Sequence, residues 1–259
     1  KIQTQINSSL DKIQKFVTDV HQKKIRPQKA IQFRNVLSLG MGGSALGPQL
    51  INSALGPQNE SMRFYFLDNT DPEGIDRTIA SIDKGLPETL ILIISKSGNT
   101  VETHNSMIEV RECYSKVGLD FARHAIAITR ENSQLAQLAS KENWLACFPM
   151  WDWVGGRTSI LSSVGLLPAA LLGENVSSIL KGAKIMDELT KCTKIKENPA
   201  AILAWMLHHA GEDKGKKSMV ILPYKDRLIY LSSYLQQLFM ESLGKEKDLK
   251  GKTVNNGLT

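Results

Sequence analysis

The sequence predicts an α/β fold in which helices cover both faces of a parallel β-sheet. Short apolar runs recur along the chain, and one of them, LILII at residues 90–94, consists entirely of branched aliphatic residues. Longer amphipathic stretches separate these runs, as the crossover helices of a parallel sheet require. Two of the runs are followed by clusters of glycine and hydroxyl-bearing residues, at the strand ends where such sheets bind ligands.

The elements are expected in regular alternation. Residues 1 to about 30 are polar with a helical period, and we expect their helix to end near Pro27. Amphipathic stretches such as 45–53 and 101–117 predict helices between the strands. The apolar runs predict five strands, at residues 35–40, 63–68, 89–95, 124–129 and 145–150.

The pattern changes after the fifth strand. Residues 159–210 are helical in period, and the linker GEDKGKK follows them. A further apolar run at 218–224 and a long helical stretch at 227–243 predict the first βα unit of a second domain. We therefore expect a first domain over residues 1–210 and an incomplete second domain over residues 211–259.

Composition narrows the class of protein. The chain has 259 residues, of which 42% are hydrophobic and 22% charged, as in ordinary globular proteins. Its formal net charge of +6 comes from dispersed lysines without interleaved aromatic residues. This pattern favours small anionic ligands over nucleic acid. No apolar run reaches the roughly 20 residues of a membrane span, so no membrane partner is expected.

Cysteine usage and the chain ends carry two further expectations. Cys113, Cys147 and Cys192 are widely spaced and form neither a disulfide framework nor a CxxC metal motif. We expect reduced thiols, a cytoplasmic location and no metal. The chain begins at Lys1 rather than at methionine, and we expect it to be a segment of a longer protein.

The first glycine loop, GMGGSALG at residues 40–47, follows the first predicted strand. Gly40, Gly42 and Ala45 satisfy the dinucleotide pattern G-x-G-x-x-G/A, and Asp68 ends the next strand. A nicotinamide-dependent oxidoreductase is therefore one alternative. Glycines that merely tighten a strand–helix turn are another. The loop alone indicates an anion or a sugar at the start of a helix.

The second loop, SKSGNT at residues 95–100, follows the third predicted strand. Ser95, Ser97 and Thr100 offer hydroxyls, Lys96 adds positive charge, and Gly98 permits an unusual backbone angle. A helix N-cap would need only one or two such residues, so we favour a binding site for a phosphate monoester. The P-loop pattern is missing, which disfavours a nucleoside triphosphate.

Together the two loops predict a cleft for one phosphorylated small molecule. Both lead from a parallel strand into a helix, so both are expected at the carboxyl edge of the sheet. A dinucleotide site would leave the second loop unexplained.

Two residues outside the loops are candidate catalytic residues. Arg157 follows two glycines in WDWVGGRTS and could stabilise a developing oxyanion, although a surface arginine beside a turn is an alternative. Glu241 lies in the last turn of a predicted helix, where the helix dipole disfavours a carboxylate by about 0.3–1 kcal/mol. That local conflict hints at a general base, although a solvated glutamate is an alternative.

The combined motifs GMGGSALGP, SKSGNTVET, VGGRTSILSSVGL and QQLFMESLGK resemble the glucose-6-phosphate isomerase family of the bacterial type. The resemblance runs from about Asn35 to Lys245. It implies a sugar-isomerase (SIS) fold, a three-layer sandwich around a five-stranded parallel sheet, and a sugar-phosphate substrate. It implies an aldose–ketose isomerase that interconverts glucose 6-phosphate and fructose 6-phosphate through an enediolate, with no cofactor.

The resemblance also implies roles for particular residues. Arg157 would stabilise the enediolate, and Glu241 would carry the proton between C2 and C1, with Gln237 beside it. The substrate-binding residues it implies are Gly43, Ser44, Ser95, Lys96, Ser97, Gly98, Asn99, Thr100 and Gln237.

The sequence departs from this family in two respects. Thr158 follows the GGR motif, where the family usually has an aromatic residue. The family's ring-opening histidine, delivered across a homodimer interface, and a later lysine have no counterpart here. His208 and His209 lie in an earlier helical stretch and are not assigned that role. We therefore expect this segment to be inactive alone.

A non-catalytic sugar-phosphate sensor of the same fold remains the alternative of another class. It would keep both loops but would not need Arg157 and Glu241 together.

Overall fold

The computed structural model describes residues 2–56, 62–210 and 218–254. The chain divides into two compact units between Glu174 and Asn175. This division lies before the boundary that we expected at residue 210. The helices on its far side, α7 (Val176–Thr190) and α8 (Pro199–Ala210), contact each other and contribute no buried residue.

The first unit is built on a five-stranded sheet in which all strands are parallel, as the sequence predicts. The strand order is β2-β1-β3-β4-β5. The strands are β1 (Asn35–Leu39), β2 (Arg63–Leu67), β3 (Thr89–Ile94), β4 (Ala125–Thr129) and β5 (Ala146–Pro149).

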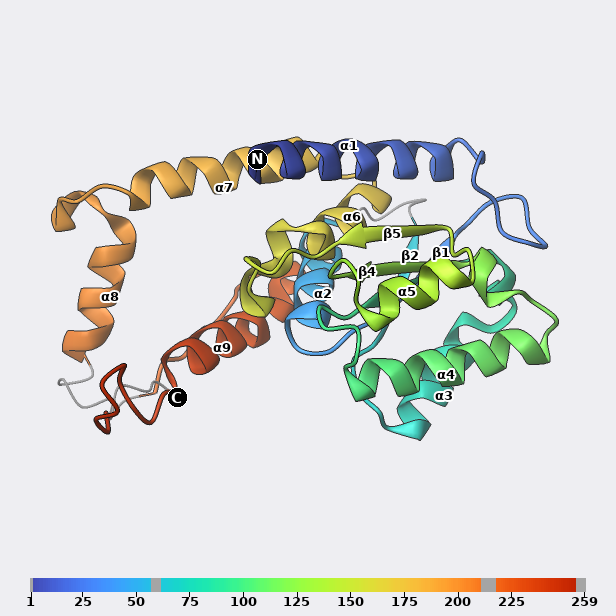
Figure 1. Ribbon diagram of the computed structural model, residues 1–259. Coiled ribbons are helices and arrows are strands. Elements are labelled where there is room, and N and C mark those ends of the chain that lie inside the picture. The colour runs from blue at the N-terminus through green and yellow to red at the C-terminus, as the bar shows by residue number, and fades with distance from the viewer. Residues whose placement is uncertain (1, 57–61, 211–217, 255–259) are drawn as a thin grey trace. The chain divides into compact units, whose positions relative to one another are not determined.

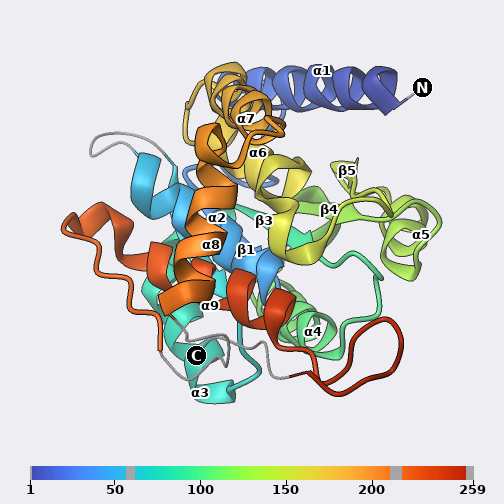
Figure 2. The same cartoon turned by 90° about the vertical axis from the view of Figure 1, so that its left-hand side faces the viewer.

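Helices cover both faces of this sheet (Figure 1). On one face lie α1 (Ile2–His21), α2 (Gly43–Leu55) and α6 (Ser163–Leu171), with α6 packed on both α1 and α2. On the other face lie α3 (Pro72–Ile82), α4 (Val101–Lys116) and α5 (Gln134–Lys141). The second view shows the strands between α1 and α6 on one side and α3 and α4 on the other (Figure 2). The three-layer sandwich is confirmed.

The apolar runs form strands because both of their faces are buried. Every residue of the three central strands, β1, β3 and β4, is buried. Alternate side chains point to opposite layers. One core cluster joins Leu37, Ile91 and Ala127 of the sheet to Val110 and Tyr114 of α4. On the opposite face, the rings of Phe16 in α1 and Phe148 in β5 meet edge to face, with their centroids 5.5 Å apart.

The first helix is shorter than expected, and short 3-10 turns follow several of the later elements. It ends at His21 rather than near Pro27, and Lys23 then adopts a positive φ of 62°. The 3-10 turns span Asp83–Glu88, Phe121–Arg123, Gly156–Leu161, Ile195–Glu197 and Asp226–Leu228.

In the second unit, the expected strand at 218–224 does not form, which corrects the prediction of a βα unit. Val220, Leu222 and Tyr224 are exposed. A strand needs a hydrogen-bonded neighbour, and the described residues of this unit offer none. The long helix does form, as α9 (Ile229–Leu243), with Gly244 at its C-cap.

Across the described ranges, no helix has both the length and the apolarity to cross a membrane.

His124 is a buried titratable group in the first unit. Its side chain is fully buried, its Nδ1 lies 2.9 Å from the Thr89 carbonyl oxygen, and its Nε2 has no hydrogen-bond partner. The rings of Phe33 and Tyr114 pack against the imidazole. Desolvation lowers the pKa of His124, and the hydrogen bond to Thr89 opposes this effect only in part.

We predict that the first unit loses stability in mild acid because of His124. The unfolded chain takes up a proton near pH 6.5, whereas the folded chain resists protonation until the pH reaches the lowered pKa. Stability contributed by the neutral imidazole is therefore complete above about pH 6.5 and declines below it, by at most ~1.4 kcal/mol per pH unit. Urea unfolding at several pH values measures this slope. In His124→Phe the slope should flatten, and an unchanged slope would show that other groups cause it.

Candidate active site

The candidate site lies where the strand order reverses. From β1 the chain passes to β2 on one side, and then to β3 on the other side of β1. The crossover helices therefore leave a crevice at the carboxyl ends of β1 and β3. The first glycine loop connects β1 to α2 at this edge, and the loop 95–100 connects β3 to α4. Both helix starts point their positive dipole ends to the same crevice.

A cavity of about 470 Å³ occupies this crevice. Six of the residues predicted from the sequence line it: Gly43, Ser44, Ser95, Lys96, Ser97 and Thr100. Its other lining residues are Met41, Ile94, Arg130, Met150, Asp152 and Gly156. The structure thus brings the two loops together. Gly98 and Asn99 belong to the second loop but do not line the cavity.

The hydroxyls of the second loop are held in place by bonds within the loop. The Ser95 and Thr100 hydroxyl oxygens lie 2.9 Å apart, and the Gly98 N–H donates to Ser95 Oγ over 3.1 Å. The Asn99 N–H donates to Ser97 Oγ over 3.2 Å. Thr100 occupies the N-cap position of α4, yet its side chain makes no capping hydrogen bond. The hydroxyl arrangement therefore exceeds what a helix cap needs.

Gly98 allows the second loop to turn tightly against α5. Its φ is 76°, in the region that side-chain-bearing residues rarely adopt. A Cβ there would also lie 2.9 Å from the backbone nitrogen of Leu135 and from Cβ of Ser133.

Lys96 connects the second loop to the segment after β5. Its ammonium donates to the carbonyl oxygens of Asp152, over 2.9 Å, and Val154, over 2.8 Å. Asp152 also meets Arg130, with 3.5 Å between Nη1 and Oδ1. The two cations at the cavity thus already have oxygen partners on the protein.

The first glycine loop touches the turn that carries Arg157. A Cβ on Gly43 would lie 2.1 Å from the Gly156 carbonyl oxygen, so only glycine fits there. Ser159 Oγ donates to the same Gly156 oxygen over 2.7 Å. Arg157 is half-buried on the 3-10 turn Gly156–Leu161, next to Gly156 on the cavity wall. It is not itself among the lining residues.

Glu241 and Gln237 belong to the second unit. Both lie on α9, four residues apart, and Gln237 Nε2 donates to Glu241 Oε1 over 2.9 Å. The Lys245 ammonium donates to the Glu241 backbone oxygen. The amide thus orients the carboxylate within its own helix.

Sequence reasoning missed Arg130 and Asp152. Arg130 directly follows β4, and Asp152 lies three residues after β5. The rule that parallel strands present ligands at their carboxyl ends could have identified Arg130. Asp152 had no such signal, because its position depends on the path of an irregular segment.

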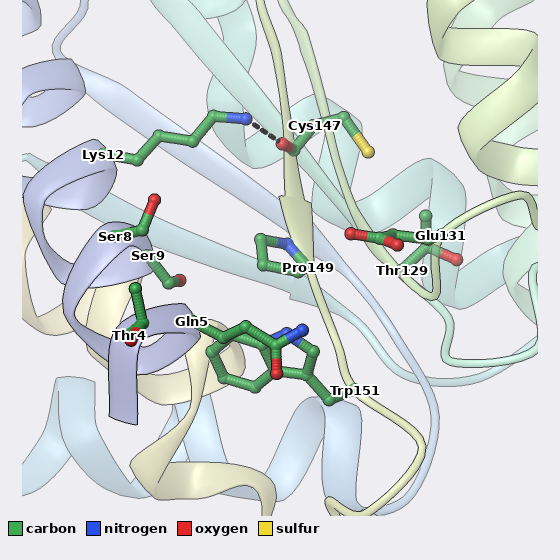
Figure 3. Close-up of a pocket in the computed structure, with 10 residues that line it drawn as sticks. All are labelled: Thr4, Gln5, Ser8, Ser9, Lys12, Thr129, Glu131, Cys147, Pro149 and Trp151. Atoms are coloured by element: carbon green, nitrogen blue, oxygen red, sulfur yellow. Dashed lines mark hydrogen bonds between the residues drawn. The ribbon is translucent and has the colours of Figure 1, made fainter. Parts of the chain in front are cut away.

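A second cavity, of about 540 Å³, opens between α1 and the ends of β4 and β5 (Figure 3). None of the residues predicted for the site, all of which the structure describes, lines this cavity. The Lys12 ammonium donates to the Cys147 carbonyl oxygen over 2.7 Å, and burial raises the pKa of the Cys147 thiol. The first cavity is therefore the candidate site.

In the described part of the chain, no cluster of His, Cys, Asp and Glu is suited to a metal ion.

Comparison with known proteins identifies the family of the chain. A family model described as phosphoglucose isomerase matches residues 1–258. The whole chain aligns with the glucose-6-phosphate isomerase of Cyanothece sp., with 53% identity over 258 residues and 49% of that protein covered. It is 54% identical to the chloroplastic glucose-6-phosphate isomerase 1 of Arabidopsis thaliana, of which it covers 42%. The chain thus spans about half the length of these relatives.

Solved structures support the fold. A glucose-6-phosphate isomerase from Chlamydia trachomatis matches 96% of this chain, with a TM-score of 0.82, 28% identity and 46% of its own chain covered. A tagatose-6-phosphate ketose/aldose isomerase from Escherichia coli matches 93% of this chain, with a TM-score of 0.51, 15% identity and 60% of its own chain covered. The second likeness is one of fold alone, and it confirms the sugar-isomerase sandwich.

The contact between Gly43 and Gly156 generates a prediction with a matched control. Gly43→Ala forces a methyl group against the Gly156 carbonyl and should cost roughly 1–3 kcal/mol in the free energy of unfolding. Gly156→Ala places its methyl group in open space at the same contact and should cost less. Urea denaturation of both variants tests this. Equal losses would contradict the close approach.

Proposed function

The chain belongs to the phosphoglucose isomerase family, and from this premise we propose that the full-length protein interconverts glucose 6-phosphate and fructose 6-phosphate. The main support for this proposal is the match of residues 1–258 to the family model. The cavity between two helix starts supplies the physical reason, since it suits a small phosphorylated molecule.

In this proposal the second loop holds the substrate phosphate. The hydroxyls of Ser95, Ser97 and Thr100 and the N-terminus of α4 converge on one cavity. Gly43 and Ser44 approach from the start of α2, with Gly98 and Asn99 shaping the loop. A phosphate dianion has several acceptor oxygens, and many uncharged donors give it a defined orientation.

The chemistry is assigned to Arg157 and Glu241. Glu241 removes the proton from C2 of the open-chain aldose and returns it to C1, while the O2 proton moves to O1. Arg157 remains charged and stabilises the enediolate oxygen that develops between these steps. Gln237, which donates to Glu241, orients the carboxylate. Because hydrogen moves only within the substrate, the proposed reaction needs no external redox cofactor.

The alternatives receive no support from the comparisons. The relatives described above are named as isomerases. For a dinucleotide site, Asp68 would have to face a ribose, yet Asp68 Oδ2 accepts a hydrogen bond from Gln49 of α2 over 2.8 Å.

We further propose that the full-length protein is a cytoplasmic homodimer. Cys113, Cys147 and Cys192 are free thiols, which fits a reducing compartment. A partner subunit would supply the ring-opening histidine that the family resemblance implies.

Glu241→Gln in the full-length protein should lower kcat by at least about 100-fold, because the amide cannot accept the C2 proton. Binding of fructose 6-phosphate, measured by calorimetry, should survive. Glu246→Gln, which changes another exposed glutamate near the end of the same helix, is the control and should leave kcat near that of the parent. Parent-like turnover in Glu241→Gln would refute the assignment of the base. Tight binding without exchange of the C2 proton in the parent protein would favour the sensor.

Ser97→Ala should raise the KM for fructose 6-phosphate roughly 10-fold, since a hydrogen bond to a charged group contributes about 1.5 kcal/mol or more. Ser140→Ala, an exposed serine on α5 away from the cavity, is the control. Steady-state kinetics measure both, and an unchanged KM in Ser97→Ala would remove this hydroxyl from the phosphate site.

A further inference from the structure

We propose that Lys96 is a positioning residue, which fixes the segment leading to Arg157 and is not chiefly a ligand of the substrate phosphate. The inference rests on the proposed isomerase function. It revises the role that family resemblance assigns to Lys96.

The geometry of the Lys96 ammonium supports this role. The group carries three N–H donors. Two carbonyl oxygens, on Asp152 and Val154, lie 2.9 and 2.8 Å from Nζ, both within hydrogen-bond range. At most one donor therefore remains for a phosphate oxygen. A charged ligand of the phosphate would be expected to present more of its donors to the cavity.

The segment that Lys96 holds is joined to the sheet at its start, where the N–H of the buried Met150 donates to the Thr129 carbonyl oxygen over 2.8 Å. It runs from the end of β5 at Pro149 to the 3-10 turn that begins at Gly156. Asp152 and Trp153 are exposed, and Gly155 and Gly156 add backbone freedom just before Arg157. Lys96 ties the middle of this stretch, at Asp152 and Val154, to the end of β3.

Other contacts fix the segment at its two sides. The Asp152 carboxylate meets Arg130 at 3.5 Å, after β4. Gly156 lies against Gly43 at the start of α2, and Ser159 bonds the Gly156 oxygen. The Lys96 bonds act between these two contacts, on the backbone carbonyls of Asp152 and Val154. The turn that carries Arg157 is thus held from β3, β4 and α2 together.

The consequence concerns catalysis more than binding. A guanidinium that stabilises a developing oxyanion must be held in place before the reaction, because misplacement removes transition-state stabilisation. The phosphate would still find the hydroxyls of the second loop and the start of α4. Loss of the ammonium should therefore lower kcat and change KM little.

The test uses three variants of the full-length protein. Lys96→Met keeps the aliphatic stem but cannot donate, and should lower kcat at least 30-fold with a KM change below threefold. Lys96→Arg retains charge and several donors and should recover most of kcat. Ser97→Ala is the comparison from the same loop, in which KM should change instead.

Hydrogen–deuterium exchange supplies a readout that is independent of turnover. Amides in a peptide covering residues 150–157 should exchange at least tenfold faster in Lys96→Met and at the parent rate in Ser97→Ala, while peptides from β1 and β3 show that both variants are folded. Unchanged exchange at 150–157, or a tenfold rise in KM with kcat intact, would overturn the proposal. If the parent protein lacks isomerase activity, the proposed function fails, but faster exchange in Lys96→Met would still support the tether.

Discussion

The site depends on the parallel pairing of β1 with β3. Leu39 at the end of β1 lies opposite Ile93, one residue before the end of β3. The two loops therefore leave the sheet side by side, although they begin at residues 40 and 95 of the chain. The strand order opens a crevice beside this pair of strands, because β2 lies on the far side of β1 and the two crossover helices diverge. A slip of one residue in this register would move the hydroxyls away from the glycine loop.

Much of the first unit could be predicted from the sequence because its strands are buried on both faces. The five apolar runs became β1 to β5, with ends that differ by at most a residue or two. The run at 218–224 is equally apolar, yet it forms no strand. Apolar side chains favour burial, but a strand also needs backbone hydrogen bonds to a neighbouring strand. The division after Glu174 was equally hard to predict, because helical periodicity does not reveal which body a helix packs against.

The two loops of the site could be predicted from residue types, since side-chain hydroxyls and the backbone freedom of glycine can be recognised directly in the sequence. The partners of Lys96 could not. They are backbone carbonyls, which every residue possesses, and their convergence depends on the path of the chain after β5. The same limit applies to Asp152. Sequence reasoning is therefore better at finding side chains that act than at finding the backbone that positions them.

The contact at Gly43 bears on how this cavity could change in evolution. One side of the pocket is backbone against backbone, where the Gly156 carbonyl fills the space of a missing side chain. Such a surface has no rotamers to adjust and no side chain to exchange. A new substrate preference at this point would require the two chain segments to move apart together, a change that a single substitution cannot supply. Selection for other ligands should therefore act first on lining residues such as Met150 and Arg130, whose side chains can be replaced.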